Sequence, residues 1–270
     1  MAMFNPYYAL AFNPFDKHSV RETDAFESRD HREMASRLDY LKDTRGIGVF
    51  TSSPGKGKTF GLRCFEKKLN PNLYCMKYMP LSTITVSEFY KEFCSILGVS
   101  DKGGKPARFR AIQEQVWYLY HEKKQPLILA VDEAQCLSTG ILNDLKMIMN
   151  QQYDSVNCFT LILCGEPSLN HILSRQPHEA LRQRIVVHYD FQGLSDEEAV
   201  QYVLHKLSVA GSSKAIIEDA ALLAVAGQAH GNPRIIDNIM TDALIIGTQA
   251  GKNCIDTDVV MSAVGNQNLG

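Results

Sequence analysis

The sequence predicts an α/β fold, in which a five-stranded parallel sheet flanked by helices is followed by a small, entirely helical part. Three features support this prediction. From Gly46 onward, short runs rich in β-formers alternate with longer stretches of helical periodicity, which is typical of crossover units around a parallel sheet. Residues 127–131 and 159–164 are continuously apolar, as strands buried on both faces should be. After Gly193 the apolar residues recur only at helical spacing.

The predicted sheet is assembled from short segments with recognisable local patterns. The first strand, over 46–51, leads through a glycine-rich turn into a helix over 58–69. Pro106 suits the first turn of a helix, and apolar residues then recur on one face from Phe109 to Leu119, which predicts an amphipathic helix over 106–122. The other predicted elements of this part are strands over 73–79, 127–131, 159–164 and 185–189 and a helix over 86–97.

Four helices are predicted after Gly193. Ser195 and Glu198 have the spacing of a capping box, in which each side chain satisfies an amide at the start of the helix. The following helices are expected over 216–229, 233–250 and 256–264. The chain is therefore expected to consist of an N-terminal segment over 1–45, an α/β core over 46–192 and a four-helix part over 193–270.

The composition is that of a globular protein. Of 270 residues, 45% are hydrophobic and 21% are charged, and the 18 Gly and 10 Pro form no low-complexity tract, which excludes disordered and fibrous classes. No apolar run reaches the roughly 18 residues that a membrane span needs. The N-terminus lacks the pattern of a signal peptide, so we expect a cytoplasmic protein with no membrane association. The seven cysteines form no Cys-x-x-Cys pair and are expected to be reduced thiols.

Charge is distributed unevenly along the chain. The net charge is −2, from 28 Lys and Arg against 30 Asp and Glu, which argues against a protein covered in basic charge. Residues 191–270 hold 4 Lys and Arg against 9 Asp and Glu, whereas the rest of the chain holds 24 against 21. Any contact with a polyanion is therefore expected in the first part of the chain.

The turn after the first strand has the pattern of a phosphate-binding loop. Residues 52–59 read SSPGKGKT and lie between a predicted strand and a predicted helix, with Ser52 where the usual pattern has glycine. Two glycines would let backbone amides surround phosphate oxygens. A lysine would neutralise the β- and γ-phosphates, and a threonine would place its hydroxyl on Mg²⁺. The residues expected to bind ATP are Ser53, Pro54, Gly55, Lys56, Gly57, Lys58, Thr59 and Phe60, with Lys58 also catalytic and Thr59 also a metal ligand.

Two carboxylates follow the apolar strand over 127–131. Asp132 is expected to hold Mg²⁺, directly or through water, and Glu133 to polarise the attacking water. These residues and the glycine-rich turn supply complementary parts of one site. The pattern therefore predicts Mg²⁺-dependent hydrolysis of ATP.

Together, these motifs resemble AAA+ ATPases of the branch that holds general-secretion ATPases and the ATP-dependent target-selection proteins of bacterial transposons. The resemblance rests on the loop over 52–59, on LILAVDEAQ over 127–135 and on LILCGEPSL over 161–169. It extends to NPF over 13–15 with DHRE over 30–33, to ALRQRI over 180–185 and to GNPR over 231–234, and so covers nearly the whole chain. It implies a P-loop AAA+ core, a helical lid and a homo-oligomer that forms a ring or a helical filament.

The resemblance also implies roles for charged residues outside the loop. Arg184, or failing it Arg182, would be an arginine finger that reaches the γ-phosphate bound by a neighbouring subunit. Arg234 would be the second sensor, which touches phosphate from the same chain. Glu166 stands where the family generally presents an uncharged polar first sensor, and two alternatives stay open for it, a sensor role or an orientation toward water.

One dense basic stretch is the candidate for binding DNA. Residues 101–110, DKGGKPARFR, are expected to lie in a loop before the amphipathic helix and carry Lys102, Lys105, Arg108 and Arg110. Such a loop would follow the phosphate backbone of double-stranded DNA independently of sequence. The alternative is a solvated loop with no ligand. Lys77 and the loop over 82–85 are weaker candidates.

Three hypotheses for the function remain open. The preferred one is an ATP-dependent, DNA-binding regulator of transposition that recruits a transposase and hydrolyses ATP across subunit interfaces. The second is an energy-coupling ATPase that assembles a secretion complex. Members of that kind are expected to carry a membrane span and a cell-wall-binding domain beyond the lid, and residues 1–270 show neither, which favours DNA. The third is an ATP-gated scaffold with little turnover.

Overall fold

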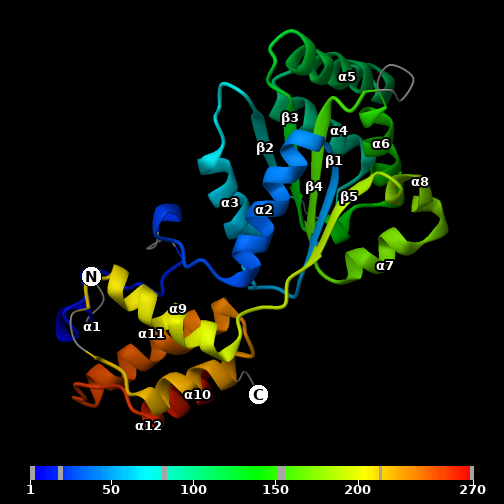
Figure 1. The fold of residues 1–270 in the computed structure, drawn as a ribbon. Helices are drawn as coiled ribbons and strands as arrows, with labels where there is room; N and C mark the ends of the chain where they lie inside the picture. The colour runs from blue at the N-terminus through cyan, green and yellow to red at the C-terminus, as the bar shows by residue number, and fades with distance from the viewer. Residues whose placement is uncertain (1–3, 18–20, 81–83, 151–155, 213–214, 268–270) are drawn as a thin grey trace. The chain divides into compact units, whose positions relative to one another are not determined.

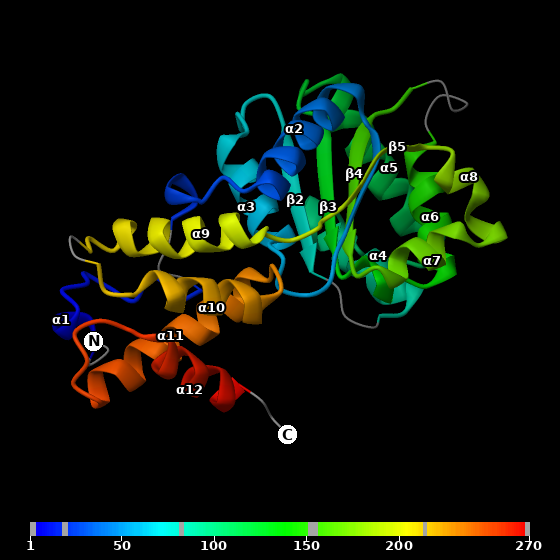
Figure 2. The same ribbon diagram turned by 60° about the horizontal axis from the view of Figure 1, so that its bottom comes forward.

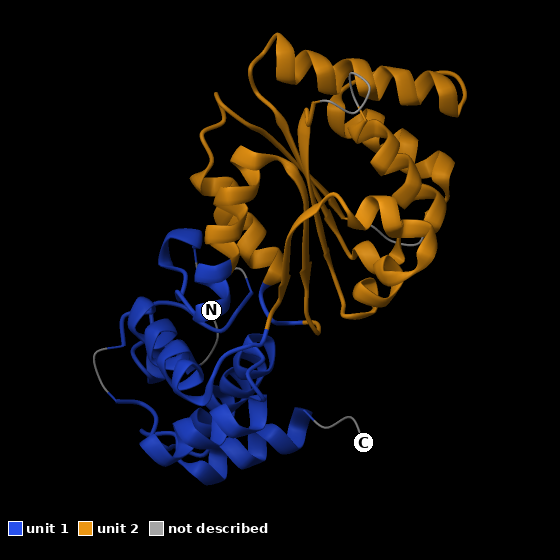
Figure 3. Cartoon of the chain, turned by 45° about the vertical axis from the view of Figure 1, so that its right-hand side comes forward, with its two compact units in different colours: residues 1–33, 55–57, 192–270 blue, residues 34–54, 58–191 orange. Residues whose placement is uncertain are grey.

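The computed structural model describes residues 4–17, 21–80, 84–150, 156–212 and 215–267 (Figure 1). The chain divides into two compact units (Figure 3). The core unit comprises residues 34–54 and 58–191, and the lid unit comprises residues 1–33, 55–57 and 192–270. The core unit therefore begins at residue 34, whereas the sequence analysis expected the α/β core to begin at residue 46. The core unit ends at residue 191, where the sequence analysis expected residue 192.

The core unit contains the predicted five-stranded parallel sheet, in the order β2-β3-β4-β1-β5. Its strands are β1 (Gly46–Thr51), β2 (Cys75–Pro80), β3 (Leu127–Asp132), β4 (Phe159–Gly165) and β5 (Ile185–Asp190). Every residue of β1, β3 and β4 is buried, as expected for central strands, whereas β2 and β5 are partly exposed at the edges. In register, Thr51 pairs with Gly165 and Val131 with Leu163, so β1, β4 and β3 end side by side.

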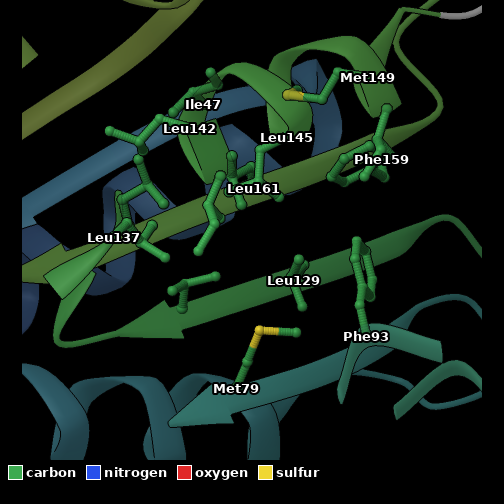
Figure 4. Packing of buried hydrophobic residues seen from close by; sticks show 14 of the residues in the cluster. Ile47, Met79, Phe93, Leu129, Leu137, Leu142, Leu145, Met149, Phe159 and Leu161 are labelled. Carbon is green, nitrogen blue, oxygen red and sulfur yellow. The ribbon is translucent and has the colours of Figure 1, made fainter. Parts of the chain in front are cut away.

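Helices cover both faces of the sheet (Figures 1 and 2). Buried residues of α2 (Arg29–Thr44) and α3 (Lys58–Lys68) share a cluster with one face of the central strands. On the other face, a larger cluster joins the strands to α4 (Val86–Leu97), α5 (Lys105–His121) and α6 (Thr139–Met149), with contributions from the short α7 (Ser168–Ser174) and α8 (Glu179–Arg182). Figure 4 shows this second cluster, in which Leu145 of α6 lies against Leu161 of β4.

The sequence analysis did not predict helix α2, although its apolar spacing is regular. Met34, Leu38 and Leu41 recur at intervals of four and three residues and are at most 1% exposed. The Ser28 hydroxyl accepts a hydrogen bond from the backbone N–H of His31 at 3.2 Å and so caps the start of the helix. Burial of each large apolar side chain contributes about 1.5–3 kcal/mol, so this stripe fixes α2 on the sheet.

Helix α4 shows how local sequence sets both ends of an element. Thr85 and Glu88 form a capping box at its start, and Gly98 ends it in the left-handed conformation at φ 69°. Helix α5 corrects one expectation, because Lys105, Arg108 and Arg110 lie on this helix and not in a loop. Gly104 precedes the helix and Pro106 occupies its first turn, where proline loses no helical hydrogen bond.

The lid unit is helical, as the periodicity predicts. Its helices are α1 (Phe4–Tyr7), α9 (Asp196–Val209), α10 (Asp219–Ala229), α11 (Pro233–Gln249) and α12 (Thr257–Gln267). The capping box of Ser195 and Glu198 is present at the start of α9. N-terminal residues join the core of this unit, since Phe4, Tyr8 and Phe15 are buried in the same cluster as the four long helices.

A buried ion pair lies inside the lid unit. The Lys206 ammonium is 2.7 Å from an Asp237 carboxylate oxygen, and the Tyr202 hydroxyl also donates to Asp237. Burial lowers the pKa of Lys206 and raises the pKa of Asp237, so each charge depends on its partner.

Across the described ranges, no helix has both the length and the apolar composition of a membrane span.

Candidate functional site

The predicted phosphate-binding loop lies where the sequence places it, after β1 and before α3. Gly55 and Gly57 have φ values of 87° and 95°, a conformation that favours glycine and turns successive amides toward one point. Ser52 is not among the described residues with positive φ, so its replacement of glycine causes no backbone strain. Ser53 and Pro54 are exposed on the loop, and Phe60 packs its ring 5.2 Å from the Arg63 guanidinium.

Lys58 occupies the first position of α3 and is half-buried. Its ammonium donates to the backbone oxygen of Ser52 at 2.9 Å and to the Ser52 hydroxyl at 2.8 Å. Burial lowers the pKa of Lys58, while the nearby carboxylates of Asp132 and Glu133 oppose that shift. A half-buried cation whose hydrogen bonds here go to neutral oxygens of Ser52 is well suited to exchange these partners for an anionic ligand.

Asp132 ends β3 and is the meeting point of three elements. One of its carboxylate oxygens accepts hydrogen bonds from the Thr59 hydroxyl at 2.6 Å and from the Tyr78 hydroxyl at 2.9 Å. Asp132 is 5% exposed, and burial together with this hydrogen bond raises the pKa of Tyr78. Hydroxyl and carboxylate oxygens are the ligands that Mg²⁺ prefers, so Thr59 and Asp132 fit the predicted metal role.

Glu133 follows at the tip of β3 in the left-handed conformation, at φ 54° and ψ 37°. A glutamate is uncommon in this conformation, which is a form of local strain that tends to occur at functional positions. Its side chain is exposed, and one carboxylate oxygen accepts a hydrogen bond from the Gln135 side-chain amide at 2.7 Å. The geometry therefore brings Lys58, Thr59, Asp132 and Glu133 to one end of the sheet.

Glu166 contributes its backbone to this region. Its N–H donates to the Gln135 side-chain oxygen at 3.0 Å, and its carboxylate is among the groups that oppose the burial-driven lowering of the Lys58 pKa. Sequence reasoning missed the roles of Tyr78 and Gln135. A signal for Gln135 was its place two residues after Glu133, and a signal for Tyr78 was its place near the end of the strand that pairs with β3.

The two candidate arginine fingers differ in their surroundings. Arg182 is the last residue of α8. Its guanidinium donates to the backbone oxygens of Leu173 at 2.9 Å and Ser174 at 2.8 Å, the last two residues of α7, and so caps that helix. Arg184 lies in the turn before β5 and is half-buried. Arg182, the second choice that the resemblance implies, thus already serves a structural purpose inside its own chain.

Within the lid unit, the loop tip at 55–57 contacts the motif that contains Arg234. A Cβ atom on Gly55 would lie 2.5 Å from Asn232 Oδ1 and 2.9 Å from Arg234 Cβ, so only glycine fits there. Asn232 caps α11 by accepting the backbone N–H of Arg234 at 3.0 Å, while the Arg234 side chain is exposed. The Lys56 ammonium donates to the Gln192 backbone oxygen at 2.8 Å.

The predicted DNA-binding residues differ in whether their side chains have partners within the chain. Lys105 pairs with Asp144 at 2.7 Å, and Arg108 donates to the backbone oxygen of Asp101 at 2.8 Å. Lys102 and Arg110 are exposed. Lys77 is half-buried on edge strand β2, and residues 82 and 83 of the weaker candidate loop lie outside the described residues.

Comparisons with known proteins agree with this arrangement. A family model described as an AAA domain matches residues 41–173. General secretion pathway protein A of Aeromonas hydrophila is 28% identical over 256 residues, which cover 94% of this chain and 46% of that protein. The chain therefore spans about half the length of this curated relative.

Solved structures share the fold. Cdc6p from Pyrobaculum aerophilum has a TM-score of 0.72 at 17% identity, covering 95% of this chain and 71% of that one. The Aeropyrum pernix ORC1 protein in complex with DNA has a TM-score of 0.70 at 14% identity, covering 94% and 68%. The Thermotoga maritima RuvB Holliday junction branch migration motor has a TM-score of 0.59 at 17% identity, covering 89% and 69%.

At these identities the structural likeness shows the fold alone. The loop after β1 and the paired carboxylates at the end of β3 are features on which the sequence resemblance also rests. Residues 41–173 thus match an AAA domain, and the chain has the AAA+ fold and resembles general secretion pathway protein A over most of its length.

Proposed function

We propose that the chain is an ATP-dependent, DNA-binding regulator of transposition that hydrolyses ATP across subunit interfaces. The observation that carries the proposal is the convergence of Lys58, Thr59, Asp132 and Glu133 at one end of the sheet. Hydrolysis of a nucleoside triphosphate needs a cation for the phosphates, oxygen ligands for Mg²⁺ and a base for water. Residues of these three kinds lie at the start of α3 and at the end of β3.

Each residue has a separate part in the proposed reaction. Lys58 would release the oxygens of Ser52 and bind the β- and γ-phosphates, so its present hydrogen bonds hold the side chain in place until a nucleotide enters. Thr59 and Asp132 would hold Mg²⁺, which withdraws charge from the phosphate oxygens. Glu133 would accept a proton from the attacking water and raise its nucleophilicity.

We infer that Arg184, the first choice that the resemblance implies, completes the site of a neighbouring subunit, with Arg182 as the alternative. The hydrogen bonds from Arg182 to the end of α7 would be lost if its guanidinium turned toward another molecule. An arginine supplied by a neighbour stabilises charge on the transferred phosphoryl group and can raise the rate by about 10³–10⁵. Turnover would therefore depend on assembly.

The proposed DNA contacts rest on exposed cations in the first turns of α5 and in the segment just before it. Lys102 and Arg110 are the first choice for contacting backbone phosphates, because Lys105 and Arg108 are engaged within the chain. ORC1 is described in complex with DNA and RuvB as a branch migration motor, which supports a DNA-directed role for a chain with the same fold. The transposase as partner rests on the sequence resemblance.

The secretion-pathway relative supports a second candidate function, an energy-coupling ATPase that assembles a secretion complex. The rate of ATP hydrolysis, measured with and without long duplex DNA at low and high salt, separates the two. Stimulation by DNA that falls with salt supports the proposal, because each neutralised phosphate releases counterions. Turnover that ignores DNA supports the secretion function, and negligible turnover with ATP-dependent sedimentation supports a scaffold.

A charge-matched comparison tests the DNA contacts. Replacing Lys102 and Arg110 by alanine should abolish stimulation by DNA while leaving the basal rate unchanged. The control replaces Lys67 and Lys68, two exposed lysines at the end of α3, and should keep the stimulation. Equal loss in both double variants would contradict a specific role for α5 and indicate a general effect of net charge.

A further inference from the structure

The side chain of Gln135 joins the tips of two strands. Its amide nitrogen donates to a Glu133 carboxylate oxygen at 2.7 Å, and its amide oxygen accepts the backbone N–H of Glu166 at 3.0 Å. Glu133 follows β3 and Glu166 follows β4, two strands that pair in parallel. One side chain therefore connects the proposed base to the backbone of the neighbouring strand.

Chemistry fixes the orientation of this amide. The backbone N–H of Glu166 can only donate, so it requires the oxygen of the Gln135 amide. The NH₂ group must then face Glu133, where an ionised carboxylate accepts and cannot donate. The reversed amide would set two donors against each other at one end and two acceptors at the other.

Gly165, at the end of β4, leaves room for this bridge. A Cβ atom on Gly165 would lie 2.7 Å from the Gln135 amide oxygen and 3.3 Å from the Gln135 backbone nitrogen. Real Cβ atoms do not approach a polar atom this closely, so a side chain at position 165 would displace Gln135. The φ of Gly165 is not in the positive range, so the close approach, and not the backbone conformation, is what requires glycine here.

Glu133 needs such a partner because its own surroundings hold it loosely. It is exposed, and its backbone is in the left-handed conformation. A misplacement of about 1 Å in a reacting group can cost about 10²-fold in rate. We propose that Gln135 is a positioning residue that holds the Glu133 carboxylate and ties it to the tip of β4, an inference that rests on ATP hydrolysis as the proposed function.

Two substitutions at Gln135 separate positioning of Glu133 from support of β4. Gln135→Met keeps the length and removes both hydrogen bonds. Gln135→Glu keeps the acceptor for the Glu166 N–H and replaces the donor to Glu133 by a like charge. The control is Gln113→Met on α5, whose amide donates to a single backbone oxygen, that of Met147.

The measurements are kcat and KM for ATP, the affinity for a fluorescent ATP analogue, and the midpoint of thermal unfolding. Gln135→Met should lower kcat by about 10–100-fold with KM and analogue affinity unchanged within about twofold, because the base and not the phosphate site is disturbed. Gln135→Glu should lose at least as much. Gln113→Met should match the wild type in all kinetic values.

A double-mutant cycle with Glu133→Gln tests whether Gln135 acts through Glu133. If it does, Gln135→Met should have no further effect on the residual turnover of Glu133→Gln. Gly165→Ala offers an independent route, since its methyl group would displace the Gln135 amide and should reproduce the kcat loss even if Gln135→Met folds poorly.

Several results would overturn the inference while leaving the proposed function standing. If Glu133→Gln abolishes turnover and Gln135→Met keeps a wild-type kcat, Gln135 positions nothing. Wild-type kcat in Gln135→Glu would mean that the side chain only supports the Glu166 backbone. Additive losses in the cycle would mean that Gln135 acts apart from Glu133. Absence of turnover in the wild type would instead refute ATP hydrolysis itself.

Discussion

Replacing Gly48 with alanine would set a methyl group into overlap with Leu41 Cδ2 and 3.2 Å from Phe50 Cε2. Gly48 lies in β1, the strand that leads into the phosphate-binding loop, and Leu41 is the last apolar residue of the α2 stripe. Leu41 and Phe50 are fully buried, so neither can move aside freely. Overpacking of this kind costs about 1–3 kcal/mol of unfolding free energy.

Leu41→Ala alone should cost about 2–5 kcal/mol, since it removes three buried carbons and leaves a cavity. In the double variant, the methyl group of Ala at position 48 would enter the space that Leu41 vacates. The two losses should therefore not add, and the double variant should be about 1–2 kcal/mol more stable than their sum.

Denaturant unfolding followed by tryptophan fluorescence measures this coupling in the right unit, because the single tryptophan, Trp117, lies on α5 in the core unit. The control pairs Gly48→Ala with Leu145→Ala, a fully buried leucine on the opposite face, and these losses should add within about 0.5 kcal/mol. Additive losses for Leu41 and Gly48 would refute the contact of α2 with β1.

Three further predictions address the site and the lid. Burial lowers the pKa of Lys58, and bound phosphates would raise this pKa again. Affinity for an ATP analogue should therefore fall by up to about tenfold per pH unit once the pH exceeds the lowered pKa of the nucleotide-free protein. A titration from neutral to alkaline pH measures this fall, which Lys58→Arg should not show. Lys206→Met should cost about 3–5 kcal/mol of unfolding free energy, because it leaves the Asp237 carboxylate buried without its partner. Exchanging both residues for apolar ones should restore most of this loss, as measured by thermal unfolding. Arg184→Ala should abolish assembly-dependent turnover without lowering the unfolding temperature. Arg182→Ala should lower the unfolding temperature, because it removes the hydrogen bonds to the end of α7. If Arg182→Ala abolished turnover and Arg184→Ala lowered the unfolding temperature, the two roles would be exchanged.

Local patterns were enough to predict most of the core unit. Continuous apolar runs give the central strands, and the glycines at 55 and 57 mark the loop after β1. These signals are strong because a strand buried on both faces tolerates few polar residues. The order of the strands was not predicted, since apolar runs carry no information about their neighbours in the sheet.

Other features depend on contacts between distant residues and could not be predicted. Helix α2 has three buried apolar residues among many charged ones, so its pattern differs little from that of a solvated helix. The two glycines made the basic stretch at 101–110 look like a loop, although the helix predicted over 106–122, which is present as α5, already included Arg108 and Arg110. The bridge from Gln135 to Glu166 joins residues 31 positions apart, and nothing in the local sequence of either one indicates it.

Single-turnover hydrolysis by Glu133→Gln tests the central claim most directly. The claim is that Lys58, Thr59 and Asp132 bind the nucleotide with its metal, while Glu133 serves only as the base for water. We expect Glu133→Gln to bind the ATP analogue with wild-type affinity and to release phosphate at least about 10²-fold more slowly. Phosphate release at the wild-type rate, or loss of analogue binding in this variant, would contradict that division of roles.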